Sequence, residues 1–250
     1  MSLKAVSFST LAAGLLLAGA AYAAPDVDEI VAKAIAARGG YDAIKALDSA
    51  RINGEMNMMG NPAPMRMEWK RPNKMRMEFD FQGMTAVMAY DGEGGWSIMP
   101  FLGKTTAEPM AEDQLKDVKN QADFDGELVD YKAKGHQVEL IGKEEVDGTD
   151  AWHLKLTKAS GDIEHMYLDA EHYLPFKQTS NTTRQGVTTT INTLFGDYQE
   201  VDGVLFPFYA EAMPEGAPAG QAITILSIEP NVEIDDARFA MPADETTAVK

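Results

Sequence analysis

The sequence predicts a mainly β protein with a few helices, of the α+β class, and three observations support this. Many short segments alternate apolar and polar side chains, which is the pattern of half-buried strands. Turn-forming residues separate these segments, notably the Asp-Gly pairs at 147–148 and 202–203, which are typical of hairpins. Helical periodicity occurs near the start of the chain and again in its middle, between two blocks of strands.

The helical stretches have recognisable ends. The first begins after Asp26, a suitable N-cap, and stops at Gly39-Gly40. The second is the charged segment 106–131, which we expect to be helical and to separate the two blocks of strands. Its apolar side chains are spaced for one helix face: Met110, Leu115 and Val118.

The first block of strands is rich in methionine, because eleven of the 15 methionines lie between residues 56 and 110. In residues 74–81 every second side chain is methionine or phenylalanine, and each side chain before Phe81 that separates them is charged. Since alternate residues of a strand point to the same side, we expect one apolar sheet face, and the residues assigned to it are Met56, Met58, Met65, Met67, Trp69, Met75, Met77, Phe79, Phe81, Met84, Met88 and Trp96.

Methionine is not a preferred strand residue, so this choice needs a reason. One interpretation is a cavity wall that repacks around variable apolar ligands, a task that suits the unbranched, polarizable thioether. The other is that methionine simply fills gaps between a curved sheet and the helices that cover it. The pattern alone favours neither interpretation.

The N-terminal segment has the features of a secretory signal peptide over residues 1–23. Lys4 precedes a short apolar run, and Ala21-Tyr22-Ala23 provides a small-residue cleavage site. We therefore expect export to the periplasm, a single domain over residues 24–242 and a flexible tail over 243–250. Ala24 stands where a bacterial lipoprotein would need a cysteine, so we expect a soluble protein without a lipid anchor.

Composition excludes several classes of function. The absence of cysteine rules out disulfides, thiolate metal sites and cysteine nucleophiles. A formal net charge of −17 disfavours binding to nucleic acid and permanent residence on an anionic membrane. No apolar stretch is long enough to predict an integral membrane protein.

Motifs for catalysis or metal binding are not evident. The four histidines (His136, His153, His165 and His172) do not form a metal-binding pattern, and no nucleophile elbow for a catalytic serine occurs. The glycine-rich stretch 91–95 lacks the lysine and following helix of a phosphate loop, so we interpret it as a turn. Carboxylates are plentiful, but nothing singles out a catalytic pair. We expect no enzymatic activity, no cofactor and no metal.

Several short motifs occur in the order found in a known group of proteins. They are Lys70-Arg71-Pro72-Asn73, then Asp91-Gly92 with Trp96, then Pro100-Phe101, and later the stretches 167–177 and 200–208. Over about residues 27 to 242 this series resembles the outer-membrane lipoprotein-sorting proteins of the LolA/LolB-like carrier superfamily. The chain lacks the N-terminal cysteine of the LolB type, so it is similar to the LolA type.

The resemblance implies a fold and a mechanism. The fold would be an incomplete antiparallel β-barrel of about eleven strands with a helical lid, whose apolar face holds acyl chains. Arg71 would inherit the role of the arginine that bonds the lid backbone, and the best lid candidate is the helix around Met110, Leu115 and Val118.

The leading hypothesis is therefore a soluble periplasmic carrier that moves a lipoprotein or another lipid toward the outer membrane. It would hold the acyl chains of its cargo and make transient contacts with an inner-membrane donor and an outer-membrane acceptor protein. The alternatives are a lipid-sensing or partner-binding module without transport activity, and a hydrolase of lipids or glycans.

Overall fold

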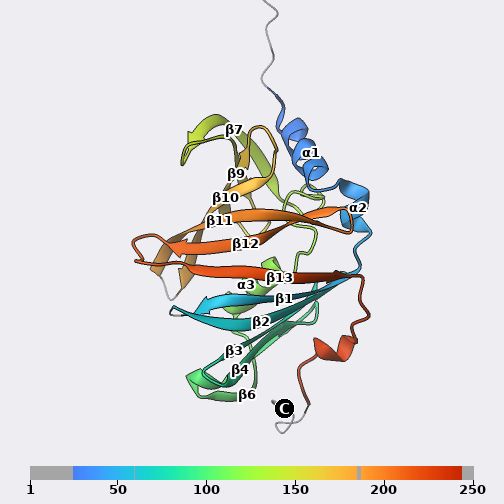
Figure 1. Cartoon of the computed structure of the whole chain (residues 1–250), viewed down its shortest axis with the longest axis vertical. Helices are drawn as coiled ribbons and strands as arrows, with labels where there is room; N and C mark the ends of the chain where they lie inside the picture. Colours follow the sequence, from blue (N-terminus) through green and yellow to red (C-terminus); the bar gives the residue numbers. More distant parts are fainter. Residues whose placement is uncertain (1–24, 59, 185–186, 244–250) are drawn as a thin grey trace, which may run out of the picture.

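The computed structural model describes residues 25–58, 60–184 and 187–243. Within these residues, thirteen strands form one antiparallel sheet in the order β6-β5-β4-β3-β2-β1-β13-β12-β11-β10-β9-β8-β7 (Figure 1). The predicted signal peptide (1–23) and all but the first residue of the predicted tail (243–250) lie outside the described residues, so both remain predictions.

The strands have the following bounds: β1 (Ser49–Met58), β2 (Asn61–Lys70), β3 (Lys74–Phe81), β4 (Met84–Tyr90), β5 (Gly95–Met99), β6 (Lys104–Pro109), β7 (Gln137–Val146), β8 (Thr149–Thr157), β9 (Ile163–Asp169), β10 (Pro175–Arg184), β11 (Val187–Val201), β12 (Val204–Pro214) and β13 (Gln221–Pro230). The helices are α1 (Val27–Ala37), α2 (Tyr41–Lys45) and α3 (Glu112–Gln121), with short 3-10 helices at Pro100–Leu102 and Asp236–Arg238.

The sheet consists of two blocks, β1–β6 and β7–β13, and β1 joins them by pairing with β13. The outermost strands β6 and β7 do not pair with each other, so the sheet stays open. This confirms the incomplete antiparallel barrel, with thirteen strands where the resemblance implied about eleven. One of the additional strands is β6, which takes up residues 106–109 of the segment 106–131 that was expected to be helical, and within that segment α3 covers only Glu112–Gln121.

The hairpin turns follow from local backbone chemistry. Asp147 and Gly148 have φ values of 51° and 82°, and Asp202 and Gly203 have 52° and 79°. Two consecutive residues with positive φ make the turn that matches the twist of paired strands, and Asp-Gly adopts it readily. The predicted hairpins β7–β8 and β11–β12 are therefore present.

All three helices lie on one face of the sheet, which we call the inner face. Ile30, Val31 and Ala34 of α1 pack against the inner side chains of β7–β9. Ile44 of α2 packs on Phe206 and Phe208 of β12. Helix α3 lies behind β13 and β1 in the view of Figure 1, over the strands that carry the methionines.

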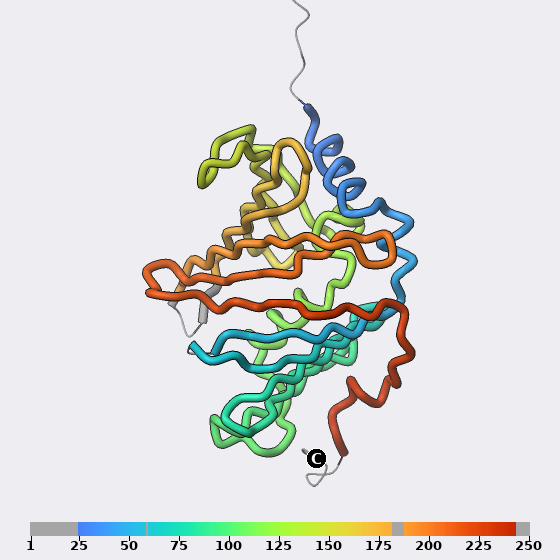
Figure 2. Tube along the Cα trace, in the orientation of Figure 1, coloured from blue at the N-terminus to red at the C-terminus, as the bar shows by residue number. Residues whose placement is uncertain are grey.

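The segment after β13 covers part of the opposite, outer face. Its Arg238 bonds Glu68, a fully buried carboxylate on β2 that also accepts from Arg51. Figure 2 shows this C-terminal segment (red) descending beside the lower strands. The long connection from α3 to β7, in green, passes behind the central strands in the same view.

Candidate functional site

The predicted methionine face exists as one apolar cluster on the inner face. Register brings the side chains together: Met67 pairs with Met77, which pairs with Met88. Ten of the twelve residues assigned to the face belong to this cluster: Met56, Met58, Met65, Met67, Trp69, Met75, Met77, Phe79, Phe81 and Met88.

Two predicted residues are not part of the cluster. Met84 lies opposite Phe81 and so shares the methionine face, but it is half-buried at the end of β4. Trp96 pairs with Ala89, and directly opposed residues share a face, so Trp96 lies on the outer face with Val87 and Ile98. Its indole Nε1 donates to the carbonyl of Phe239 at 2.8 Å. The assignment of Trp96 to the methionine face is thus corrected: the register across the 91–94 turn could not be read from the alternation.

Helix α3 fills the space above the methionine cluster. Met110, Leu115 and Val118, the three predicted lid residues, all pack against it. The helix approaches so closely that a Cβ on Gly95 would lie 2.8 Å from the Met110 sulfur and 3.0 Å from Leu115 Cδ1. With α3 in this position the methionine cluster is a packed core.

An apolar cavity of about 300 Å³ lies beside the cluster, under the connection that follows α3. Helix α1 and residues 123–129 form one side of it, and strands β9–β12 form the other. Its apolar walls include Ile35, Phe124, Leu128, Phe195 and Phe206. Of the predicted cavity residues, Trp69 alone lines it, with its ring 5.4 Å from that of Phe124.

A larger hollow of about 490 Å³ lies along β2–β4 and the C-terminal segment. Its wall includes the charged side chains Arg76, Glu78 and Arg238. These pair with one another, since Glu78 Oε1 is 2.7 Å from Arg76 Nε and 3.1 Å from Arg238 Nη2. A hollow lined by several charged side chains is a poor site for an acyl chain.

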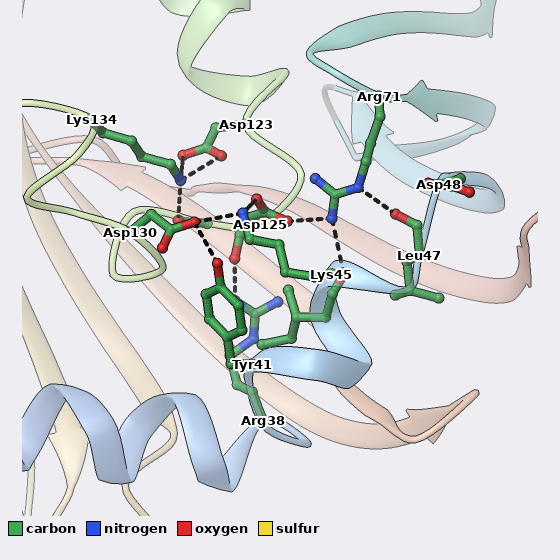
Figure 3. A network of polar contacts seen from close by, with 12 residues as sticks. Arg38, Tyr41, Lys45, Leu47, Asp48, Arg71, Asp123, Asp125, Asp130 and Lys134 are labelled. Atoms are coloured by element: carbon green, nitrogen blue, oxygen red, sulfur yellow. Dashed lines mark hydrogen bonds and ion pairs between the residues drawn. The ribbon is translucent and has the colours of Figure 1, made fainter.

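Arg71 fastens the connection that roofs the cavity of about 300 Å³, and Figure 3 shows its bonds to Asp125 and Leu47. Its guanidinium donates to the backbone carbonyls of Leu47 at 2.8 Å and Ile44 at 3.0 Å, and to Asp125 Oδ1 at 2.5 Å. The resemblance implied a bond to the lid backbone; here the backbone acceptors belong to α2 and the residues after it. The partner in the roof is instead the side chain of Asp125.

Asp125 is the centre of a network that joins α1, α2 and the roof (Figure 3). Its other carboxylate oxygen accepts from Lys45 at 2.6 Å, and its backbone carbonyl accepts from Arg38 at 2.9 Å. Burial raises the pKa of Asp125, but the hydrogen bonds from Arg71 and Lys45 outweigh this effect, so the pKa lies below its usual value. The side chain is therefore an anion that holds the roof on two cations.

A second anchor lies two residues further on and was missed from the sequence. Glu127 Oε1 is 2.5 Å from Lys158 Nζ, and the same ammonium is 2.5 Å from Glu164 Oε1. Gln178 donates to the other oxygen of Glu164. Burial and the charge of Glu127 raise the pKa of Glu164 to about 7. The sequence did contain a sign of this anchor: Glu164 alternates with Met166 and Leu168, so a charged side chain points inward with two apolar ones.

We call residues 110–136 the cover segment, because they span α3 and the connection to β7. Within it, α3 lies on the methionine cluster and residues 123–129 roof the cavity. Two of the groups that fasten it are the carboxylates of Asp125 and Glu127, which pair with cations on separate parts of the frame. The arrangement can enclose an apolar chain.

In the described part of the chain, no group of three or more His, Cys, Asp or Glu side chains is placed to hold a metal ion. His153 and His165 lie on the outer face, with ring nitrogens 2.7 Å apart, and Glu144 is 2.6 Å from the other nitrogen of His153. Each described helix is too short or too polar to cross a bilayer.

Comparison with solved structures shows which fold this is. A LolA superfamily protein from Nitrosomonas europaea superposes with a TM-score of 0.59 at 13% identity, over 87% of this chain and 98% of that one. An outer membrane lipoprotein-sorting protein domain from Vibrio parahaemolyticus gives 0.57 at 15% identity, over 84% and 94%. A DUF1329 family protein from Desulfovibrio piger gives 0.61 at 14% identity, over 86% and 97%.

The chain thus has a LolA-like fold, as the motif series predicted. No protein-family model matches the sequence, and comparison with curated proteins finds no significant match. At identities of this level the comparisons define the fold alone, so a functional assignment has to come from the site.

Proposed function

We propose that this protein is a non-enzymatic carrier, exported to the periplasm, that encloses the acyl part of a lipid or lipoprotein beneath its cover segment. The observation that supports this most directly is the apolar cavity roofed by residues 123–129. A cavity for a ligand needs a route in, and a roof fastened by ion pairs can open without dismantling the sheet. Transport toward the outer membrane, with transient donor and acceptor partners, belongs to the same proposal.

Energetics support an acyl ligand. Burial of one CH₂ group contributes roughly 0.8 kcal/mol, so a chain of about sixteen carbons would gain on the order of 12 kcal/mol before ordering costs are subtracted. The cavity holds only part of such a chain, because about 300 Å³ is the small end of the range for ligand sites. The adjoining methionine cluster is made of adaptable side chains, so displacement of α3 would extend the cavity along it.

Native mass spectrometry tests the proposal. Residues 24–250 would be purified from a periplasmic extract without detergent, and intact spectra would be compared with an organic extract of the same sample. A bound lipid or acylated peptide would support the carrier function and identify the class of cargo. An empty protein that also fails to bind an acyl-chain fluorophore would contradict it and favour a sensing or partner-binding module.

A further inference from the structure

Arg38, at the C-terminal end of α1, lines the cavity and is not used by the roof's ion pairs. Its guanidinium makes one hydrogen bond within the described residues, from Nη1 to the carbonyl of Asp125. Because a guanidinium carries five N–H donors, most of them remain available. Burial lowers the pKa of Arg38, yet arginine stays protonated under all ordinary conditions.

The charges around Arg38 do not balance. Each nearby carboxylate has another cation: Asp125 pairs with Lys45 and Arg71, Asp130 with Lys45, and Asp123 with Lys134. No ion pair to Arg38 occurs in the part of the chain that the structure describes. In a protein whose formal net charge is −17, this network therefore carries an excess positive charge at the wall of an apolar cavity (Figure 3).

The remaining charged group at the cavity does not supply the missing anion. Glu127 also lines the wall, but it shares Lys158 with Glu164, and these three side chains form a separate cluster with no ion pair to Arg38 in the described residues. A cation in a partly apolar site is costly unless it is paired or well hydrogen-bonded, so the site gains most from a ligand that brings its own negative charge. The apolar walls require that the rest of this ligand be hydrocarbon.

We propose that the cavity binds a single-chain amphiphile with an anionic head group, a carboxylate or a phosphate, which is held by the free N–H groups of Arg38. The chain lies against Phe124, Phe195 and Phe206. This inference rests on the proposed carrier function and names the class of its ligand: an acidic lipid with one chain in the cavity. Carboxylate and phosphate both match the planar fork of a guanidinium.

The test compares three ligands that have the same chain and different heads: decanoate, decyl phosphate and decanol. Binding to residues 24–250 would be followed by the fluorescence of Trp69, which lines the cavity, in the Trp96→Phe/Trp152→Phe background. The variant is Arg38→Gln, and Lys33→Gln is its matched control, because Lys33 is an exposed cation on the same helix paired with Glu29. Arg38→Lys retains the charge and loses the fork.

We expect the parent protein to bind at least one of the two anions about tenfold or more tightly than decanol, the range of a charge-assisted hydrogen bond. Arg38→Gln should abolish that preference, so that the anions bind no more tightly than decanol does, Arg38→Lys should keep part of it, and Lys33→Gln should keep all of it. Preference for only one of the anions identifies the head group.

Two results would overturn the inference. Equal affinity of the parent for all three ligands would remove the head-group site and leave the acyl-chain carrier intact. An anion preference that persists in Arg38→Gln, with thermal unfolding unchanged, would place the anion at another cation. Failure to bind any of the three ligands contradicts the proposed function itself, so the two proposals fail in distinguishable ways.

Discussion

The two halves of the inner face differ in what covers them. Over β1–β5, the methionine cluster is covered by α3, and its central side chains are buried, Met75 fully. Over β9–β12, the roof 123–129 leaves a cavity of about 300 Å³. The alternating methionines make the first half easy to recognise in the sequence, and in the structure α3 buries them. The second half has no comparable sequence pattern, yet it contains the cavity. Apolar patterning therefore identifies a face, and the element above it decides whether the face is core or cavity.

The largest effect is expected in the packed half. Met75→Ala removes a side chain with no exposed surface, so we expect a loss of about 2–5 kcal/mol in the free energy of unfolding. Met213→Ala is the matched control, because Met213 is 38% exposed and should change stability by less than about 0.5 kcal/mol. Urea unfolding measures both. Equal small losses would show that the methionine cluster is loosely packed and closer to a cavity wall.

The roof should depend on Asp125. Asp125→Asn removes the carboxylate that pairs with Arg71 and one of the two that pair with Lys45, so we expect a loss of about 1–3 kcal/mol in the free energy of unfolding and faster hydrogen exchange in residues 122–136. The lowered pKa of Asp125 contributes stability that is present above its unfolded pKa and is lost as the pH falls through the folded pKa. Asp125→Asn has no carboxyl group at this position, so its free energy of unfolding should fall less on acidification than that of the parent protein.

Asp150→Asn is the control for the Asp125 variant. Asp150 pairs with Lys143 at 2.8 Å on an exposed hairpin, where an ion pair contributes about 0–1 kcal/mol. Hydrogen exchange in residues 122–136 should not change in this variant. If Asp125→Asn behaves like Asp150→Asn, the roof is held by its apolar contacts alone.

The second anchor should respond to pH in the opposite direction. The pKa of Glu164 is raised to about 7, so the folded state binds a proton that the unfolded state has released, and stability falls as the pH rises from the unfolded pKa toward 7. We expect this fall to amount to about 1–3 kcal/mol and to disappear in Glu164→Gln. Urea midpoints between pH 4.5 and 8 measure the difference, with the exposed Glu139→Gln as control. Parallel curves for Glu164→Gln and the parent would contradict the raised pKa.

The smallest effect concerns the closeness of α3 to the sheet. Gly95→Ala would place a Cβ 2.8 Å from the Met110 sulfur, and because methionine is flexible we expect a cost of only about 1 kcal/mol. Gly94→Ala is the neighbouring control, since a Cβ there meets nothing within 4 Å. Acyl-fluorophore binding adds a second measurement: a loosened α3 should raise the rate of uptake in Gly95→Ala only. Identical behaviour of the two variants would show that α3 does not restrict access.

Much of the fold was predictable because it depends on neighbours in the chain. Alternation in residues 74–81, the cap and stop signals of α1, and the Asp-Gly turns are local properties of side chains and backbone dihedrals. The ordered motif series predicted the incomplete barrel through its resemblance to the LolA-like carriers. Strand β6 was missed since its residues, Lys104–Pro109, show no alternation and become a strand only by pairing with β5.

The sequence by itself determined which side chains share a face within each strand, because the side-chain period of a strand is two. Only the tertiary structure decided how those faces align across an irregular turn, which is why Trp96 lies opposite to its expected side. It also decided that Arg38, Trp69 and Phe195, far apart in the chain, meet at one cavity. Contacts of that kind depend on how the cover segment crosses the sheet, and no local pattern encodes that path.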